Sequence, residues 1–484
     1  MNKNVKLNYI YNLMYQLLII ILPIITIPYL ARTLGSEGNG IYGYTLSIAT
    51  YFTLIGSLGI ALYGQREIAY QQDSEYKRSK IFWELNIIKS LTMTISMIVF
   101  YFIYARAGQY SLYYKILLLE IFANIIDISW FYQGMEEFKT IILRNFTIRM
   151  ICLFCIFIFI KNSSDIWKYV LIYSVSTLLG NLSLWVNIKN KIKLVELKKL
   201  DIKKHIKPIL LLFIPQIAIQ LYTVLDKSMI GIISNNMSEV AYYDQAQKVI
   251  KTLMTIITSI STVMLPRISS CYAKKDKKRI KEYINNSFKF IFMLAFPMIF
   301  GIIAVSNSFV PFFFGRGYDK IKIVMPLLSI IILFISISSL IAQLLLSIKQ
   351  TKKYTISVVS GAIINFILNI ILIYYFKSIG ACIATVIAEF CIASIDLYFI
   401  RDNFNTFEII NNNKQYIVLS LIMFFICYSF NYLNLPNIFL MLIQLVIGIS
   451  VYVIGLYVIK DKFFIDIFKN MTSIIKGKFQ KKGV

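Results

Sequence analysis

Fourteen long apolar segments follow one another along this chain, and this succession constrains the fold more than any other feature. A helix needs roughly 20 apolar residues to cross the hydrocarbon core of a bilayer. Only 15% of the 484 residues are charged, whereas soluble domains carry about 25%. The sequence therefore predicts an all-α polytopic membrane protein with about 14 transmembrane helices. We expect the spans near residues 8–31, 40–62, 81–104, 112–133, 145–160, 168–188, 208–233, 242–265, 288–306, 323–346, 356–376, 379–399, 416–431 and 438–459.

The first apolar run, Leu7 to Leu30, is expected to remain as a transmembrane helix. It is longer than the roughly 7–15 apolar residues of a signal peptide core, and it ends at Ala31-Arg32 without a small-residue cleavage site. Lys and Arg are concentrated in the loops that share a side with the N-terminus when every span is crossed in turn. Because basic loops are retained in the cytoplasm, we expect both termini to be cytoplasmic.

Two of these cytoplasmic loops are especially basic, residues 189–207 and 267–289. One interpretation is that they only fix the topology; the other is that they also attract an anionic head group or an anionic lipid surface. Such loops explain the formal net charge of +26 without any binding of nucleic acid. His205, the single histidine, lies in the first of them, and we expect it to be solvated.

The first basic loop divides the twelve leading spans into two sets of six. A shift of 200 residues superposes like residues of the two sets: Gln16 and Gln216, Tyr42 and Tyr242, and Asn86 and Asn286. Each set also begins with two spans joined by a short polar turn, at 35–40 and at 234–239. Sets with an even number of helices keep their orientation, so they would be parallel repeats.

Four parts are therefore expected along the chain. Their predicted bounds are an N-terminal lobe at 1–188 (spans 1–6), a basic cytoplasmic linker at 189–207, a C-terminal lobe at 208–400 (spans 7–12), and spans 13–14 with a basic cytoplasmic tail at 401–484. The two C-terminal spans lie outside the repeat.

Polar residues repeat at helical spacing inside several spans, where lipid would exclude them. In the first span Asn12 and Gln16 share a face that continues toward Pro23. Proline frees a backbone carbonyl and can kink a membrane helix. The pattern fits a helix that bends beside a hydrated cavity, and it equally fits an ordinary packing kink.

The fourth span carries Glu120, Asn124 and Asp127 on one predicted face. A carboxylate at mid-depth is kept protonated by desolvation, so either acid is a candidate for ion coupling or gating. A structural hydrogen bond to a neighbouring helix is the alternative interpretation. In the twelfth span Glu389 lies near the middle and is a further candidate.

The second half holds more ionisable residues toward the external side. Asp226 and Lys227 come late in the seventh span, and Asp244, Lys248 and Lys251 share a face early in the eighth. Asp244 and Lys248 have the order that favours an ion pair within a helix. These groups either lock helices together or, because base is in excess, bind a phosphate-bearing ligand.

Several segments resemble one known family. The stretch Pro28-Tyr-Leu-Ala-Arg-Thr-Leu-Gly35 with Gly38-Asn-Gly-Ile-Tyr-Gly43 is similar to the start of bacterial polysaccharide transporters of the Wzx flippase type. The most recognisable segment runs from Asp127 to Lys139 and on to Arg144-Asn145. Tyr222 to Lys227, Tyr243 to Lys248, Met264 to Ser269 and Phe314 to Tyr318 extend the similarity over roughly the first 400 residues.

The resemblance implies a member of the multidrug/oligosaccharidyl-lipid/polysaccharide (MOP) exporter superfamily, with two six-helix MATE-like lobes around a cavity and two C-terminal helices. It implies a flippase in the bacterial cytoplasmic membrane that moves undecaprenyl-pyrophosphate-linked oligosaccharide repeat units by alternating access, for capsule or O-antigen-type polysaccharide. Arg32 matches a cationic residue that contacts pyrophosphate in related lipid II flippases. Anionic membrane lipids, a polysaccharide polymerase and other assembly proteins are expected partners.

The candidate residues follow from these patterns and from the resemblance. For the pyrophosphate and the glycan they are Arg32, Lys227, Lys248, Lys251, Asn12, Gln16 and Gln216. For ion coupling or gating by a proton or sodium they are Glu120, Asp127, Asp226 and Glu389. We find no nucleotide-binding loop, metal cluster or catalytic triad, so we predict no enzyme, no metal and no bound cofactor. The alternative function is a multidrug or organic-cation antiporter of the same superfamily, which would favour a more acidic cavity.

Overall fold

The fold is helical throughout the part of the chain that the structure describes. The computed structural model describes residues 3–402, 404–467 and 469. At 3–20, 197, 214–216, 218–222, 262–263 and 406 it gives the course of the backbone only. No strand occurs within these ranges. The predicted all-α membrane fold is confirmed.

Eleven helices among the described residues are long and apolar enough to cross a membrane. The other three predicted spans correspond to the first half of α1, to α4 and to α8. Side chains are only partly described in α1 and α8, and α4 has 15 residues, fewer than a straight crossing of roughly 20 residues requires. The count of fourteen therefore stays a prediction.

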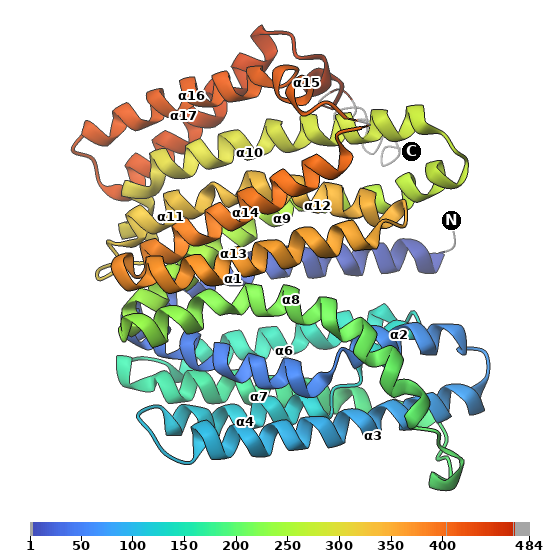
Figure 1. Ribbon diagram of the computed structural model, residues 1–484. Helices are drawn as coiled ribbons and strands as arrows, with labels where there is room; N and C mark the ends of the chain where they lie inside the picture. The colour runs from blue at the N-terminus through green and yellow to red at the C-terminus, as the bar shows by residue number, and fades with distance from the viewer. Residues whose placement is uncertain (1–2, 403, 468, 470–484) are drawn as a thin grey trace, which may run out of the picture. The chain divides into compact units, whose positions relative to one another are not determined.

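The chain forms two compact units, of which the first comprises the residues up to Gln245 together with Asn365–Ala381. Within it, α4 packs on α7 and α3, and α7 also packs on α6 (Figure 1). Its helices are α1 (Lys3–Ser57), α2 (Ile60–Tyr70), α3 (Glu75–Phe100), the π-helix η1 (Tyr101–Ala105), α4 (Ser111–Ile125), α5 (Ser129–Gly134), α6 (Phe138–Phe159), η2 (Ser163–Asp165), α7 (Ile166–Trp185), η3 (Ile188–Asn190), η4 (Leu197–Lys199) and α8 (Lys203–Ser234).

The second unit comprises Ala246–Ile364 and the chain from Cys382 onward. Three helices belong partly to each unit, namely α9 (Met237–Ala273), α13 (Thr351–Phe376) and α14 (Ser378–Ile400), so the lobe boundaries expected from the sequence remain a prediction. The remaining helices are α10 (Lys277–Phe313), α11 (Ile321–Ser329), α12 (Ile331–Ser347), α15 (Thr406–Asn411), α16 (Lys414–Ser429), η5 (Phe430–Tyr432) and α17 (Asn437–Val458).

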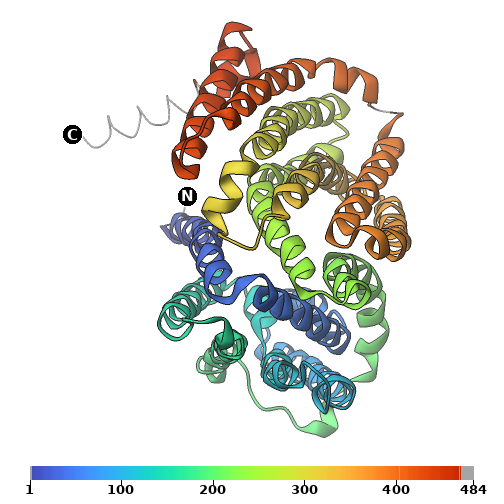
Figure 2. The ribbon, with the colours of Figure 1, turned by 90° about the vertical axis from the view of Figure 1, so that its left-hand side faces the viewer.

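Long α10 organises the second unit. It packs against α16, α17, α11 and α12, and Figure 2 shows the red C-terminal helices running along the yellow-green α10. At 37 residues α10 is about 55 Å long at 1.5 Å per residue, which exceeds the roughly 30 Å of a hydrocarbon core. One or both of its ends must therefore extend beyond the membrane interior.

Apolar side chains on the outer faces of the helices match a lipid environment. On α13 the exposed residues include Ile363, Phe366, Ile367 and Ile370, which repeat every three to four positions and so form one stripe. A soluble monomer rarely exposes apolar surface on this scale. The stripe marks a helix face that contacts lipid.

The first two predicted spans correspond to two helical segments of α1, which meet at Gly35 without an intervening loop. Residues 36–40, predicted as a loop, are helical, and the break in α1 is confined to Gly35, whose φ is +70°. Such a φ suits glycine because it lacks a Cβ. The polar residues of the predicted turn therefore serve as helix residues just after a sharp corner.

Candidate functional site

A buried carboxylate, Asp226 of α8, lies at the centre of a hydrogen-bond network in the first unit. Only 2% of its surface is exposed. Its Oδ2 accepts a hydrogen bond from the Tyr243 hydroxyl, and its Oδ1 accepts one from Asn369 Nδ2 at 2.7 Å. Asn369 Nδ2 also donates to Asn365 Oδ1 at 3.0 Å. These donors replace the water that a carboxylate loses when it is buried among apolar helices.

This network also presents unsatisfied polar atoms. Asn369 Oδ1 and Asn365 Nδ2 are buried and have no hydrogen-bond partner among the described residues. Carboxylate and amide oxygens are the ligands that hard cations prefer, and a buried carboxylate can also hold a proton. The role of Asp226 in ion coupling stays a prediction.

Lys227, the next residue of α8, pairs with Asp244 of α9. The distance from Nζ to Oδ1 is 3.0 Å, and the two side chains are 19% and 4% exposed. The sequence suggested a pair between Asp244 and Lys248 within one helix, and the structure adds this partner from the neighbouring helix. The Lys227 charge is thus balanced within the first unit.

The other predicted phosphate ligands have different surroundings. Arg32 is exposed on α1 three residues before the break at Gly35, whereas Lys248 and Lys251 are half-buried on α9 in the second unit. The structure shows Lys227 paired with Asp244. That Arg32, Lys227, Lys248 and Lys251 form one binding site stays a prediction. Three predicted amide contacts lie outside the described side chains: Asn12, Gln16 and Gln216.

Asn39 is a structural residue that the sequence did not single out. Its Nδ2 donates to the carbonyls of Leu30 at 2.9 Å and Gly35 at 2.8 Å, which lie at the break in α1, where helical partners are missing. Its Oδ1 accepts from Gln245 Nε2 at 3.1 Å. The side chain thereby closes the corner in α1 and links it to α9.

Glu120 of α4 lies beside a cluster of tyrosines. The ring centroid of Tyr42 is 4.4 Å from that of Tyr169 and 5.9 Å from that of Tyr173, and Glu120 lies near Tyr42 and Tyr173. Its Oε2 is buried without a hydrogen-bond partner among the described residues. Leaving a buried carboxylate oxygen unpaired is costly, and the role of Glu120 in coupling stays a prediction.

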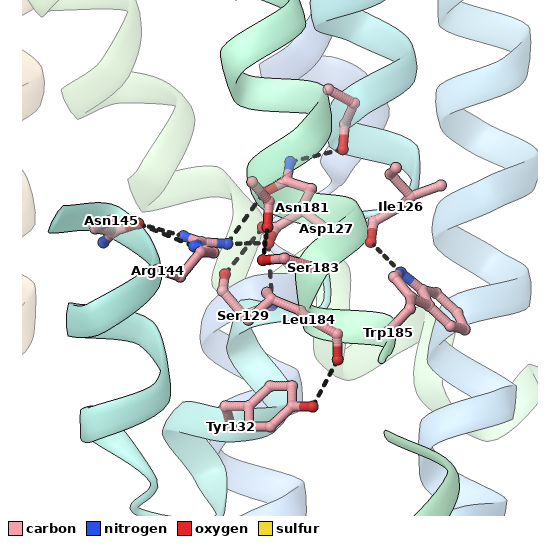
Figure 3. Close-up of polar contacts among 12 residues, drawn as sticks. Ile126, Asp127, Ser129, Tyr132, Arg144, Asn145, Asn181, Ser183, Leu184 and Trp185 are labelled. Carbon is pink, nitrogen blue, oxygen red and sulfur yellow. Dashed lines mark hydrogen bonds and ion pairs between the residues drawn. The ribbon is translucent and has the colours of Figure 1, made fainter. Parts of the chain in front are cut away.

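Asp127 does not share the face of α4 that the sequence predicted. It lies in the break between α4 and α5, where its carboxylate accepts hydrogen bonds from Ser129 N and Oγ, both at 3.0 Å (Figure 3). Arg144 of α6 lies 3.9 Å from Asp127 Oδ1 and donates to Asn145 and, at 3.1 Å, to Asn181 of α7. The prediction assumed that Asp127 continues the helix that carries Glu120 and Asn124, but α4 ends at Ile125.

The segment after Asp127, which carries the strongest resemblance, builds one end of the first unit. Trp130 is fully buried and stacks on Phe82 of α3 at 5.7 Å. A Cβ at Gly64 would come within 2.5 Å of the Trp130 ring. Glycine, which has no side chain, therefore allows α2 to lie this close to α5. The Tyr132 hydroxyl donates to the Leu184 carbonyl at 2.6 Å (Figure 3). The motif thus stabilises packing among α2, α3, α5 and α7.

The expectation that His205 is solvated was wrong. His205 is 2% exposed; its Nε2 lies 2.8 Å from Glu84 Oε2, and its Nδ1 lies 2.8 Å from the Tyr63 hydroxyl. The linker does not extend into water, because Lys193 N donates to Ser79 Oγ at 2.9 Å and Asp201 N donates to Glu84 Oε1 at 2.6 Å. The many lysines of this linker suggested a solvated loop, but its backbone is hydrogen-bonded to side chains of α3.

Two family models match the chain. The model described as "Polysaccharide biosynthesis protein" matches residues 5–272, which is more than half of the sequence. This chain belongs to the polysaccharide biosynthesis protein family. The model described as "MatE" matches residues 212–371. The resemblance expected from the residues is confirmed, together with its placement in the MOP superfamily.

Relatives of this chain include proteins named as transporters and flippases. A protein named "Putative O-antigen transporter" from Escherichia coli (strain K12) is 27% identical over 391 residues, which cover 79% of this chain and 93% of the relative. "Lipid II flippase MurJ" from Thermosipho africanus (strain TCF52B) is 31% identical over 205 residues, 40% of each chain. The first of these matches extends over almost the whole relative.

Solved structures with the same fold include lipid II flippase MurJ in an inward closed conformation. The TM-score is 0.72 at 21% identity, and the match covers 96% of this chain and 99% of that one. An inward-facing multidrug resistance MATE family transporter gives 0.60 at 14% identity, with 79% and 97% covered. These matches confirm the MATE-like fold predicted for the polysaccharide biosynthesis protein.

Proposed function

We propose that this chain is a flippase that moves undecaprenyl-pyrophosphate-linked oligosaccharides across the bacterial cytoplasmic membrane for surface polysaccharide synthesis. The observation that carries the proposal is family membership combined with a match over 93% of a named O-antigen transporter. Buried charged networks inside apolar helices support it, because polar groups at membrane depth are tolerated where they serve a polar pathway or each other. The transport step breaks no covalent bond.

A deletion strain tests this function directly. Loss of the flippase should abolish the surface polymer and leave lipid-linked repeat units accumulated on the inner leaflet, and the intact chain should restore export. Normal surface polymer in the deletion strain, with no accumulated intermediate, would overturn the proposal. Variants returned to this strain, each with a cysteine introduced near Lys3 or near Asp461, test by cysteine labelling the proposal that both termini are cytoplasmic.

The basic residues Arg32, Lys227, Lys248 and Lys251 bind the diphosphate during transport in this proposal. Guanidinium and ammonium groups make charge-assisted hydrogen bonds to phosphate. Arg32→Ala and Lys251→Ala should each reduce export while the protein still inserts. Lys115→Ala is the matched control, because Lys115 is an exposed cation of α4 near the same predicted membrane face. Unchanged export in both test variants would exclude these two ligands.

Coupling to a proton or sodium gradient is proposed at Asp226, with Glu120 as a second acid. Asp226 is surrounded by hydroxyl and amide groups, whereas the Asp127 carboxylate is engaged by Ser129 at the start of α5. Glu389 is 6% exposed on α14 and remains the candidate of the second unit. Substitution of Asp226 is the first test of coupling.

A drug or cation antiporter is the second candidate function, and the match of residues 212–371 to the MatE model favours it. The basic character of the predicted outer-half residues opposes it, because an organic cation would be repelled. Drug sensitivity and surface polymer should therefore be measured in the same deletion strain. A change in drug sensitivity with unchanged polymer would favour the antiporter.

A further inference from the structure

A polar cavity lies at the basic end of α10, within the second unit. Its volume is about 360 Å³, and its wall includes Lys281, Asn285 and Lys289 of α10. The opposite wall comes from the connection between α14 and α16, with Phe404 and Asn413. None of the residues that line it belongs to the network around Asp226.

The charges in this cavity are not balanced by the protein. No ion pair or hydrogen bond joins the side chains of Lys281, Asn285 or Lys289 to another described residue. Glu408 is the one acid in the lining and is exposed, so the lining carries two cations against one anion. This excess of positive charge in the lining favours an anionic group.

Asn413 gives a second, independent indication of a ligand. It is 4% exposed, and its Nδ2 donates to the Ile409 carbonyl at 2.6 Å. Its Oδ1 is buried and has no hydrogen-bond partner among the described residues. An unpaired buried acceptor calls for a donor such as a hydroxyl group, and Asn413 is one of the residues that line the cationic cavity.

An apolar groove of about 260 Å³ adjoins the cavity. Phe288, Ile409 and Asn413 line both. Along α10 the groove continues through Phe292 and Phe296, whose rings stack at 5.4 Å. Its far wall is formed by Phe334 of α12 and Phe390 of α14, with centroids 5.4 Å apart.

The polar and apolar parts follow one face of a single helix. Lys281, Asn285, Lys289, Phe292 and Phe296 are spaced three or four residues apart, which keeps them on one side of α10. From Lys281 to Phe296 the rise is about 22 Å at 1.5 Å per residue. The basic end is the one that the sequence predicts to be cytoplasmic, so the groove leads from the membrane surface into its interior.

We propose that this cavity and groove bind an anionic glycerophospholipid of the cytoplasmic leaflet. The phosphate lies between Lys281 and Lys289, a head-group hydroxyl donates to Asn413 Oδ1, and an acyl chain occupies the groove between α10, α12 and α14. Basic pockets between transmembrane helices recognise anionic lipid head groups in this way. Phosphatidylglycerol has all three features: a phosphate, free hydroxyls and acyl chains. The proposal does not depend on the transported substrate.

Lipid binding to the purified full chain in detergent, measured by native mass spectrometry, tests the proposal. Phosphatidylglycerol should bind more tightly than phosphatidylethanolamine with the same acyl chains. The double variant Lys281→Ala/Lys289→Ala should weaken phosphatidylglycerol binding by about tenfold or more, because each basic residue near an anionic lipid contributes about 1 kcal/mol. Lys277→Ala/Lys278→Ala is the control, since it removes two exposed charges of the same helix outside the cavity and should change binding less than twofold.

A groove variant separates lipid from soluble phosphate. Ser394 is exposed at the groove, so Ser394→Trp should block the acyl chain and weaken phosphatidylglycerol, while Ile387→Trp, two turns away on α14 and outside the groove lining, should not. Equally tight binding of glycerol phosphate, which lacks acyl chains, would overturn the lipid assignment in favour of a soluble phosphate. Tighter binding of polyprenyl phosphate than of phosphatidylglycerol would overturn it in favour of the transported lipid. Equal binding of both glycerophospholipids, or no effect of the lysine variant, would overturn it altogether.

Discussion

His205 Nε2 lies 2.8 Å from Glu84 Oε2, although 121 residues separate them in the sequence. The same carboxylate accepts a hydrogen bond from the backbone N–H of Asp201 at 2.6 Å and lies 3.1 Å from the Lys204 ammonium. The Glu84 side chain is fully buried. One acid of α3 therefore holds the end of the basic linker and the start of α8.

Replacing Glu84 by alanine should destabilise the protein strongly. The substitution leaves His205 and the Asp201 N–H buried without their acceptor, and breaking a buried pair in this way costs about 3 kcal/mol or more. We expect a lower melting temperature of the purified protein in detergent. Glu75→Ala is the control, because its partner Lys193 is 72% exposed and exposed pairs contribute little. If both variants melt alike, Glu84 does not hold the linker.

Arg144 and Asp127 should be energetically coupled. Arg144→Lys keeps the charge but loses the planar group that reaches Asp127, Asn145 and Asn181 together. We expect Arg144→Lys and Asp127→Asn each to lower stability and the double variant to lower it by less than their sum. The coupling energy should be about 1 kcal/mol in a double-mutant cycle of detergent unfolding. Strict additivity would show that the two side chains act independently.

Asp226→Asn should uncouple or block transport without unfolding the protein. The amide has nearly the same size, but it carries no charge and cannot release a proton, so a bound cation would lose its anionic ligand. In proteoliposomes we expect flipping driven by a proton or sodium gradient to fall by about tenfold or more. Asp319→Asn is the control, because the Asp319 side chain is 77% exposed in a loop. Gradient-driven flipping unchanged by Asp226→Asn would remove Asp226 from the coupling mechanism.

Two glycines three residues apart in α1 should respond differently to alanine. A Cβ at Gly40 would come within 1.7 Å of the Met237 carbonyl oxygen, whereas at Gly43 the nearest atom, Asp244 Oδ2, is 3.5 Å away. Because the first contact is with backbone, Gly40→Ala forces α1 and α9 apart, and overpacking typically costs about 1–3 kcal/mol. We expect less folded protein in the membrane and a lower melting temperature for Gly40→Ala, with Gly43→Ala close to unchanged. The opposite order would contradict this helix contact.

Apolar segments predicted the helical membrane fold well because hydropathy is a local property of the sequence. Contacts between residues of different helices could not be predicted from the sequence in the same way. Nothing near Asp226 in the sequence indicates Asn369, 143 residues away, and the pattern of Asp244 favoured a partner in its own helix over Lys227. His205 was predicted to be solvated because its loop is rich in lysine. Composition does not show that the backbone of this loop is hydrogen-bonded to α3.

Breaks within apolar runs were a further source of error. The run 112–133 was predicted as one span, yet the chain leaves the helix at Asp127, whose carboxylate bonds Ser129 instead of continuing the α4 pattern. Conversely, the polar residues after Gly35 suggested a loop, but Asn39 satisfies the carbonyls at the break and the helix resumes at once. Side-chain hydrogen bonds to the backbone decide both cases, and hydropathy does not report them.

The corner at Gly35 also determines where the first helix can move. Asn39 bonds to the carbonyls of Leu30 and Gly35 and accepts from Gln245, so these hydrogen bonds hold the corner in the middle of α1 in place. Pro23 and Pro28 lie a few turns before it, and each lacks the N–H that would stiffen the helix. A swing of the first span would therefore be a rotation of its N-terminal half about the proline segment, with the Gly35 corner at rest.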